Sequence, residues 1–366
     1  MKVKEIAAVL ESFAPLAYQE SYDNCGLQVG NPNAEVTKAL ITLDVTEEVM
    51  NEAVACGCNL VIAHHPLIFS GLKKVIGRNN IERIVEMAIK KDIAIYAIHT
   101  NLDNMLDGVN AKIASKLGLV NTQILSPKEN TLCKLYTYVP KGSVEKVRTA
   151  LFAAGAGSLG KYEECSFNLE GKGSFKPQPN SNPTIGKAGG PTEWVEEVKL
   201  EVLVQQHQEK KVLQALFSSH PYEEVAYELI LLRNTNQDIG AGIVGFLSEE
   251  MLENDFLSFL KNKMKVACIR HTELLNKPVK KVAVCGGAGS FLLKEAMNSN
   301  ADIFITGDYK YHQFFDAERK IVIADIGHYE SEQYTKELIQ RILTEKKPTF
   351  ATLLSKTDTN PVNYFY

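Results

Sequence analysis

Two segments that lie far apart in the chain repeat one pattern of strand, helix and strand. Residues 39–65 (ALITLDVTEEVMNEAVACGCNLVIAHH) align without a gap with residues 282–308 (VAVCGGAGSFLLKEAMNSNADIFITGD). The following strand also corresponds, because IAIYAIHT (93–100) matches IVIADIGH (321–328). Apolar strands can look alike by chance, but the shared element order favours an internal duplication. Two such halves are expected to pack as a pseudo-dimer.

Each half has the alternating pattern of a mostly parallel sheet. Apolar runs of strand length alternate with segments that have helical periodicity. Successive strands joined by helices indicate βαβ units and an α/β fold. The predicted strands are Ala39–Val45, Leu60–Ala63, Ile93–Ile98, Lys281–Cys285, Ala301–Thr306 and Ile321–Ile326, and the predicted helices are Lys4–Phe13, Glu47–Cys56, Asn80–Lys91 and Ser290–Asn298.

The pattern changes near residue 125, which predicts a separate middle domain. The order there is β-α-β-β-α-β, the ferredoxin-like motif. It includes a strand at Leu132–Val139, a helix at Val144–Ala154, a polar stretch at Lys161–Thr192, a strand at Val195–Gln205, a helix at Glu209–Phe217 and a strand at Val225–Leu232. We therefore predict an α/β core of two similar halves, residues 1–125 and 235–366, with an inserted α+β domain at residues 130–233.

Composition excludes several classes of function. With 45% hydrophobic and 23% charged residues the chain is expected to be globular, and its net charge of −4 gives no general attraction to nucleic acid or an anionic membrane. No apolar stretch approaches the length that spans a bilayer, and the first residues lack the apolar core of a signal peptide. Seven cysteines without a repeated CxxC pair suit a reducing cytosol. We expect a cytoplasmic protein without membrane or nucleic-acid partners.

The run Leu60–Pro66 ends a buried strand in two imidazoles and a proline. Neighbours in a strand point to opposite faces, so His64 and His65 reach one site only if the backbone turns there. Pro66 permits that turn. Imidazole is a common ligand of first-row metals, although an isolated histidine pair is as often structural.

A second polar run, His99-Thr100-Asn101-Leu102-Asp103, also follows a predicted strand. The carboxylate of Asp103 can bridge two cations. Taken alone, the run is better explained as an ordinary helix start or turn, because Asn and Asp cap helices well.

A third run, Asp325 to Glu332, leaves a strand through Gly327 and enters a helix. His328 and Glu332 are four residues apart, so both project from the same helix face. The alternative is a solvated helix start with acidic residues in its first turn.

All three runs follow the carboxyl ends of strands, where ligands bind in open parallel sheets. Three imidazoles and two carboxylates exceed the needs of one tetrahedral zinc ion and suit a pair of divalent metals. We predict His64, His65, Asp103, His328 and Glu332 as ligands of two ions per chain, with zinc expected first and manganese, iron or cobalt as alternatives. His99, Asp308 and His312 are candidates for orienting the ligands or contacting a substrate, unless they are ordinary surface groups.

These residues resemble the family of GTP cyclohydrolase 1 type 2 homologs, also known as Nif-three-like proteins. The matching motifs are Tyr22–Gly30, His64-His65-Pro66, His99–Asp103, Thr306-Gly307-Asp308 and Gly327–Glu332. The resemblance implies a pseudo-symmetric protomer with two metals at the predicted ligands, assembled into a toroidal homohexamer. The middle segment is similar to PII- and CutA-type domains through Ser219–Glu224.

The leading functional hypothesis is a metal-dependent hydrolase of a small molecule or nucleotide. GTP cyclohydrolase chemistry is one form of it, although the sequence contains no phosphate loop of the GxxxxGK[ST] type. The sequence does not assign a general acid or base. The alternative is a non-catalytic metal-binding scaffold, chaperone or regulatory ring protein, and nucleic-acid binding by the ring has little support from the charge.

Overall fold

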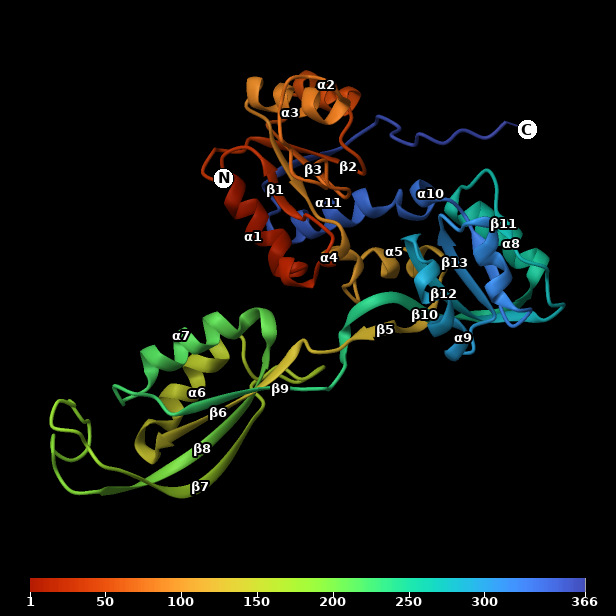
Figure 1. Ribbon diagram of the computed structural model, residues 1–366. Coiled ribbons are helices and arrows are strands. Elements are labelled where there is room, and N and C mark those ends of the chain that lie inside the picture. The colour runs from red at the N-terminus through yellow and green to blue at the C-terminus, as the bar shows by residue number, and fades with distance from the viewer. Residues whose placement is uncertain (366) are drawn as a thin grey trace. The chain divides into compact units, whose positions relative to one another are not determined.

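A computed structural model describes residues 1–365, and it divides the chain into two compact units. The first unit combines residues 1–127 with residues 238–366, and the second consists of residues 128–237 (Figure 1). Within the described residues, no helix combines the length and apolar character that a membrane span requires. The second unit therefore interrupts the first along the chain.

The first unit contains a five-stranded sheet in the order β1-β4-β3-β2-β15. Strands β15, β2, β3 and β4 run parallel, and β1 pairs antiparallel with β4. The strand bounds are Gly26–Val29 (β1), Lys38–Thr42 (β2), Leu60–Ala63 (β3), Ala94–Ala97 (β4) and Ala351–Leu354 (β15). The carboxyl ends of β2, β3 and β4 consequently lie at one edge of this sheet.

A six-stranded sheet in the order β11-β14-β13-β12-β10-β5 completes the first unit. Its central strands β12, β13 and β14 are parallel, while β10 and β11 pair antiparallel at either side of them. The bounds are Val120–Lys128 (β5), Asn236–Leu252 (β10), Arg270–His271 (β11), Pro278–Ala288 (β12), Ile303–Gly307 (β13) and Val322–Asp325 (β14). Both sheets are thus mixed, with a parallel centre.

The two parallel centres have matching registers. In the first sheet Leu60 pairs with Ala39 and with Ala94. In the second sheet Ile303 pairs with Val282 and Val322 in the same way. In the sequence alignments Leu60 matches Ile303, Ala39 matches Val282 and Ala94 matches Val322. The strand pairing therefore repeats at aligned positions.

Helices cover both faces of the parallel strands, which explains why those strands are apolar without interruption. A large apolar cluster includes residues of both sheets together with α1, α5, α8 and α11, while α2 and α3 cover the other face of the first sheet and α9 that of the second. The helix bounds are Val3–Phe13 (α1), Glu47–Ala55 (α2), Asn80–Lys90 (α3), Thr100–Asp103 (α4), Val109–Lys116 (α5), Glu253–Met264 (α8), Leu293–Asn298 (α9), His328–Glu332 (α10) and Thr335–Lys346 (α11). Short 3₁₀ helices occupy Leu16–Tyr18 (η1), Ser290–Leu292 (η4) and Tyr311–Ala317 (η5).

The second unit is an antiparallel sheet in the order β7-β8-β6-β9, with α6 and α7 packed on one face (Figure 1). Its strands are Leu132–Pro140 (β6), Ser166–Phe175 (β7), Glu193–Gln205 (β8) and Tyr227–Leu231 (β9). Its helices are Val144–Ala153 (α6) and Glu209–Ser219 (α7), with 3₁₀ turns at Lys141–Ser143 (η2) and Gln206–Gln208 (η3). Residues of β6 and β8 alternate between buried and partly exposed, as expected for a sheet with one covered face.

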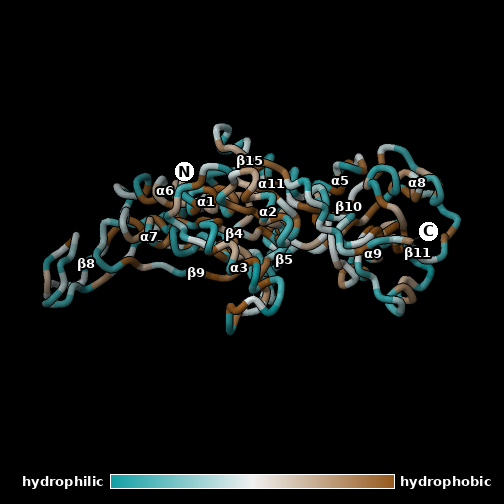
Figure 2. The backbone as a smooth tube through the Cα atoms, turned by 90° about the horizontal axis from the view of Figure 1, so that it is seen from above, coloured by the Kyte–Doolittle hydropathy of each residue, from teal (hydrophilic) through white to brown (hydrophobic). Residues whose placement is uncertain are grey.

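The predicted element pattern was incomplete, because it gave no range for β1, β5, β10, β11, β15, α5, α8 or α11, and two further parts also differ. Strand β7 lies inside the polar stretch 161–192, where no range had been assigned, and most of its residues are exposed, so they carry no apolar signal. Figure 2 shows the labelled β8 region of this unit in hydrophilic and intermediate colours. The predicted helix Ser290–Asn298 divides into η4 and α9.

Candidate metal centre

Strand β3 ends directly at the first two candidate ligands. The backbone N–H groups of His64 and His65 still donate to Thr42 and Leu43, at 3.2 and 2.9 Å, so both residues remain tied to the end of β2. The regular strand stops at Ala63, and the two imidazole centroids lie 5.0 Å apart. His64 is fully buried, and His65 is 18% exposed. The turn at Pro66 therefore lets both rings enter one site.

Helix α4 carries Asp103 to the same site. Its Oδ1 lies 3.5 Å from His64 Nε2. Among residues 1–365 neither of these two buried atoms has a hydrogen-bond partner. Buried polar atoms are rarely left without one, so such a pair indicates a missing ion or water.

Helix α10 supplies the remaining two candidates after a glycine turn. Gly327 has φ 92°, and a Cβ there would meet the Glu330 carboxylate, so glycine is required at the helix start. Glu332 is only 3% exposed, and its Oε2 lies 2.9 Å from His65 Nε2 and 3.2 Å from His328 Nε2. It also lies 3.8 Å from His64 Nε2. Glu332 is therefore the carboxylate around which the three imidazoles gather.

Every histidine of the cluster is oriented through its second ring nitrogen. Because each Nδ1 faces an oxygen acceptor, it carries the proton and leaves the Nε2 lone pair free for a cation. The Nδ1 partners are Ile98 O for His64 (2.8 Å), Asp44 Oδ1 for His65 (2.7 Å), Asp308 Oδ2 for His328 (2.7 Å) and Asp23 Oδ1 for His99 (3.0 Å). This pattern is typical of metal-binding histidines.

The charges of the cluster balance each other closely. Burial raises the pKa of Asp103 to about 7. Burial would also raise the pKa of Glu332, but hydrogen bonds from His328 and His65, together with the nearby imidazole of His64, outweigh it and hold that pKa well below its usual range. Burial alone would lower the pKa of His65 and of His328. Hydrogen bonds to neighbouring carboxylates outweigh burial and raise the pKa to about 10 for His65 and about 9 for His328. Without a cation, protons on Asp103 and on the imidazoles therefore balance the charge of the buried carboxylates. A bound metal would displace these protons.

The donor set fits a metal ion. Within the described chain, three overlapping groups each bring their ligand atoms within 4.8 Å of one another. They are His64 with His65 and His99, His65 with His328 and Glu332, and His64 with Asp103 and Glu332. Mixed imidazole and carboxylate ligation suits zinc and other first-row divalent ions. The structure brings all five predicted ligands together.

The three additional candidates differ in position. His99 joins the cluster, with its ring centroid 5.2 Å from that of His64. Asp308 lies outside it and binds His328 Nδ1. His312 does not join the cluster, because it is exposed in η5, where its ring lies near Tyr311 and Phe315.

Two functional residues, Asp23 and Asp44, were not singled out from the sequence. Asp23 accepts hydrogen bonds from His99 Nδ1 and from the backbone N–H and hydroxyl of Thr100, which fixes the start of α4. Asp44 follows β2 and binds both His65 Nδ1 and the Thr359 hydroxyl, each at 2.7 Å. The position of Asp44 just past a strand's carboxyl end was the available signal.

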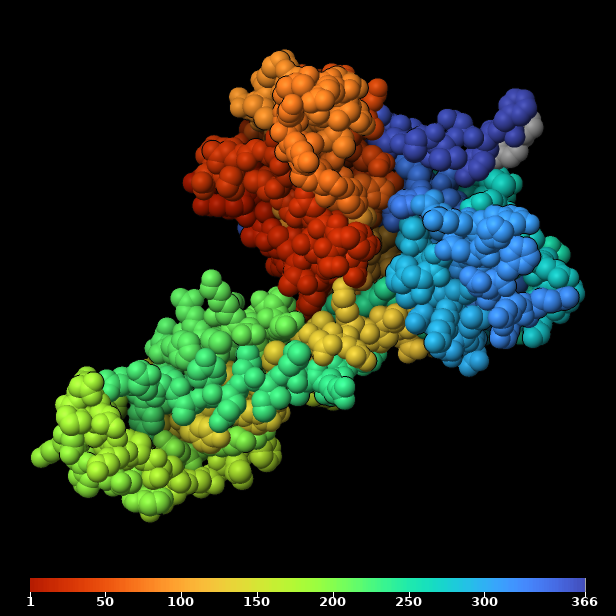
Figure 3. Space-filling view, in the orientation of Figure 1, coloured from red at the N-terminus to blue at the C-terminus, as the bar shows by residue number. Residues whose placement is uncertain are grey.

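A cavity of about 820 Å³ adjoins the cluster. His65 and His328 form part of its wall, together with Arg270 and Tyr329. Residues Asn360, Pro361, Val362 and Tyr364 of the C-terminal segment also line it. Figure 3 shows this dark-blue segment extended over the surface. The cluster is therefore open to a small molecule from this side.

The fold and the cluster together define a mixed α/β protein with buried histidine and carboxylate groups that could hold a metal ion. The chain belongs to the Duf34/NIF3 (NGG1p interacting factor 3) family, whose model matches residues 1–361. The family resemblance inferred from the motifs is thus confirmed.

Curated relatives cover the whole chain. A Bacillus subtilis (strain 168) protein named GTP cyclohydrolase 1 type 2 homolog is 41% identical, over 99% of this chain and 98% of its own. A Halalkalibacterium halodurans protein of the same name is 38% identical, over 98% of both chains.

Solved structures agree over the full length as well. The crystal structure of a Bacillus cereus protein related to NIF3 matches with a TM-score of 0.86 at 39% identity, covering 100% of this chain and 99% of that one. A Staphylococcus aureus protein matches with a TM-score of 0.79 at 31% identity and the same coverage.

Proposed function

We propose that the cluster binds two divalent metal ions per chain, with zinc expected first and manganese, iron or cobalt as alternatives. The ligands are His64, His65, Asp103, His328 and Glu332. The observation that carries the proposal is the convergence of the Nε2 atoms of three histidines on Glu332 Oε2, while each Nδ1 faces an acceptor outside the cluster.

The overlap of two of the three ligand groups supports two ions. One group contains His64, Asp103 and Glu332, and another contains His65, His328 and Glu332. Glu332 is the only member common to both, which supports one ion per group with Glu332 shared between them. Asp103, for which the sequence suggested a bridging role, lies nearer to His64.

The activity that this arrangement supports best is hydrolysis of a small molecule or nucleotide. Bound divalent ions supply Lewis acidity and lower the pKa of water, which is how paired metals serve hydrolases. Asp44 and Asp308 hold the imidazoles in orientation, and burial of Glu332 keeps its negative charge out of solvent. Arg270 at the cavity wall is half-exposed, but its guanidinium pairs with the buried carboxylate of Asp325 and donates to Tyr309 O, so it shapes the wall beside the cluster. The name of the relatives makes a GTP cyclohydrolase reaction one candidate.

The duplicated fold explains how the ligands meet. We propose that the first unit consists of two pseudo-symmetric halves, which the matching strand registers support. Hydrogen bonds repeat as well: Asn59 Oδ1 accepts from Thr37 N at 3.0 Å, and its aligned counterpart Asp302 accepts from Lys280 N at 2.8 Å.

We also assign residues 130–233 to a ferredoxin-like domain inserted in a core of residues 1–125 and 235–366. The strand order β7-β8-β6-β9 supports this assignment. The family resemblance further implies a cytoplasmic protein that assembles into a toroidal homohexamer. Sedimentation of the purified protein tests the number of chains in the assembly.

Metal analysis and a turnover assay test the proposed function. Protein purified without chelator is expected to contain about two ions per chain, and loaded protein is offered nucleotides and phosphoesters. Turnover is expected to require metal and to disappear in Asp103→Ala, but to persist in Asp107→Ala, which alters an exposed aspartate nearby. Bound metal without turnover of any substrate would favour the scaffold alternative, and absence of metal after loading would refute the site.

A further inference from the structure

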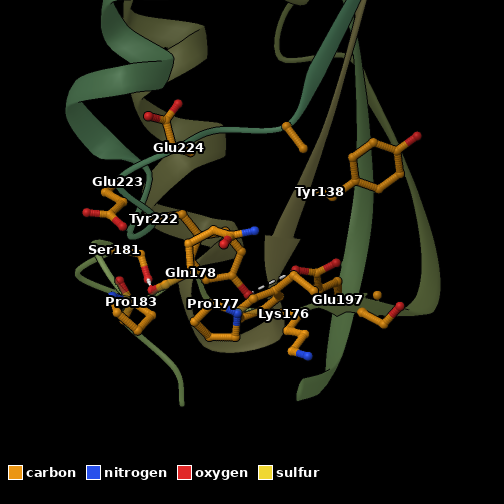
Figure 4. A pocket seen from close by; sticks show the side chains of 15 residues that line it. Tyr138, Lys176, Pro177, Gln178, Ser181, Pro183, Glu197, Tyr222, Glu223 and Glu224 are labelled. Atoms are coloured by element: carbon orange, nitrogen blue, oxygen red, sulfur yellow. Dashed lines mark hydrogen bonds between the residues drawn. The ribbon is translucent and has the colours of Figure 1, made fainter. Parts of the chain in front are cut away.

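The second unit contains a cavity of its own, with a volume of about 460 Å³ (Figure 4). Its wall combines aromatic rings with carboxylates: Tyr138, Phe175, Tyr222, Glu197, Glu223 and Glu224. None of these residues takes part in the metal centre. The volume is sufficient for a small organic molecule.

A loop after β7 closes one side of this cavity. Pro177, which is buried, begins the loop. The backbone N–H of Asn182 donates to Glu223 Oε1 at 2.8 Å, and the Thr184 hydroxyl donates to Pro221 O at 2.6 Å. Two hydrogen bonds thus attach the loop to the segment that follows α7, and the cavity beside them remains partly open to solvent.

The aromatic wall is held in a fixed orientation. Tyr222 packs edge-to-face on Phe175, at 5.8 Å between centroids, and on His220, at 5.1 Å. His220 Nδ1 accepts from the Tyr222 backbone N–H, and its Nε2 lies 3.1 Å from Tyr138 O, so His220 joins the two tyrosine-bearing segments. Burial lowers the pKa of His220, which keeps the ring neutral in this role. A prearranged wall loses little entropy when a ligand binds.

The polar groups of the wall are predominantly negative. Glu197 is partly buried, and its Oε1 accepts from the Tyr222 hydroxyl at 2.9 Å, as the dashed line in Figure 4 shows. Gly173 leaves room for this carboxylate, because a Cβ there would lie 2.0 Å from Glu197 Oε2. Lys176 is the single cationic side chain in the lining, against three carboxylates.

These carboxylates are not neutralised internally. Within residues 1–365, Glu197, Glu223 and Glu224 form no ion pair with a lysine or arginine, whereas Glu170, Glu196 and Glu201 on the same sheet do. A cation inside the cavity would interact with Glu197 and lie beside the ring of Tyr222, whose hydroxyl donates to the same carboxylate. An anion would meet repulsion from the same wall.

We propose that this cavity binds a small organic cation, an amine or quaternary ammonium compound with an aromatic or apolar body. The rings bind the body, and Glu197 binds the charged head. The site contains none of the residues of the metal centre, so the test of this proposal is independent of the proposed hydrolase function.

A series of probes with one ring system and different charges tests the proposal. Tryptamine is a cation, tryptophol is neutral and indole-3-acetate is an anion. Binding to the full-length protein is measured by titration calorimetry and mapped by chemical shifts. We expect tryptamine to bind at least about 10-fold more tightly than tryptophol, equivalent to one charged contact, and indole-3-acetate to bind least.

Two variants locate the effect. Glu197→Gln retains a hydrogen-bond acceptor for Tyr222 and is expected to remove most of the tryptamine preference. Glu196→Gln, on the opposite side of β8, removes one exposed charge and is expected to bind like the unaltered protein. Equal affinity for tryptamine and tryptophol, absence of tryptamine binding, or equal losses in both variants would overturn the proposal.

Discussion

Aligned positions that follow β3 and β13, and that follow β4 and β14, carry different side chains. His65 of the first sheet corresponds to Asp308 of the second, and His99 corresponds to Gly327. His65 points its Nε2 at the cluster, whereas Asp308 binds the Nδ1 of His328. Aligned positions after the strands thus carry either a candidate ligand or the group that orients one.

The two sides of the cluster also differ in burial. His64, from the first sheet, is 0% exposed and is tied to a backbone carbonyl of its neighbouring strand. His328, beside the second sheet, is 37% exposed and is tied to the exposed carboxylate of Asp308. The first sheet therefore forms the rigid base of the site, and the second its accessible side. Variants that treat both sides alike test this distinction.

Removal of the shared carboxylate should have the largest effect. Glu332→Gln is expected to weaken metal binding on both sides, by more than the roughly 10- to 100-fold loss typical of an orienting residue. Metal content after dialysis, measured by mass spectrometry, tests this expectation. Glu330→Gln, also buried in α10, is the matched control. Full metal content in Glu332→Gln would show that Glu332 is not a ligand.

His64 and His328 are expected to differ in how much each side chain stabilises the fold when no metal is bound. When a chelator keeps the protein free of metal, His64→Ala is expected to lower the apparent free energy of unfolding by about 2–4 kcal/mol, because the substitution leaves a buried cavity. His328→Ala is expected to change it by less than about 1 kcal/mol, because that side chain is partly exposed. Urea unfolding of the two variants measures the difference. Equal destabilisation would contradict the assignment of a buried base and an accessible side.

The orienting carboxylates offer a comparison at a smaller scale. Asp44→Asn and Asp308→Asn are each expected to weaken metal affinity by about 10- to 100-fold while metal binding persists. Asp44 should have the larger effect, because Thr359 also fixes it, whereas Asp308 is 54% exposed. Competition with a chromophoric chelator measures both affinities. A larger loss in Asp308→Asn would reverse the proposed order.

The sequence located the five residues of the cluster because their runs follow apolar strands, where a change from buried to polar residues is visible locally. His64 and His65 follow β3 without a gap, and α4 and α10 begin within three residues of β4 and β14. Asp23 could not be found in this way, because its role depends on His99, which is distant in the chain. Asp44 lay inside the predicted strand Ala39–Val45, whereas β2 ends at Thr42, so its position at a strand end was not recognised. His312 was placed near the site by proximity to Asp308, but the backbone turns at Asp308, with φ 58°, and η5 leaves it exposed.

The fold was predictable to the same extent. Central strands that are covered on both faces have continuous apolar sequences, and β3 begins and ends at the predicted residues. Short edge strands such as β1 and β15 alternate or carry few apolar residues, and their pairing depends on segments far away in the chain. Strand β7 is mostly exposed, so only its ten paired positions with β8 identify it as a strand.

The smallest predicted effect distinguishes Glu52 from its aligned counterpart Glu295. Burial slightly raises the pKa of Glu52, but hydrogen bonds from Lys356, Ser355 and Thr357 outweigh this and hold it at about 2. Glu295 Oε2, in contrast, has no hydrogen-bond partner among the described residues. Glu52→Gln is therefore expected to destabilise the C-terminal attachment by less than about 1 kcal/mol, since the site is largely solvated, and Glu295→Gln to stay within about 0.5 kcal/mol of the unaltered protein.

The pH dependence of this effect provides its control. A carboxylate with a lowered pKa in the folded state stabilises it above the ordinary value of 4.5, and the contribution is lost as the pH falls towards about 2. Amide exchange at residues 355–357 should therefore be faster in Glu52→Gln than in the unaltered protein at neutral pH, and the difference should shrink below pH 4.5. A difference independent of pH would mean that the shape of the Glu52 side chain, and not its charge, holds residues 355–357. Charge would then not distinguish Glu52 from Glu295.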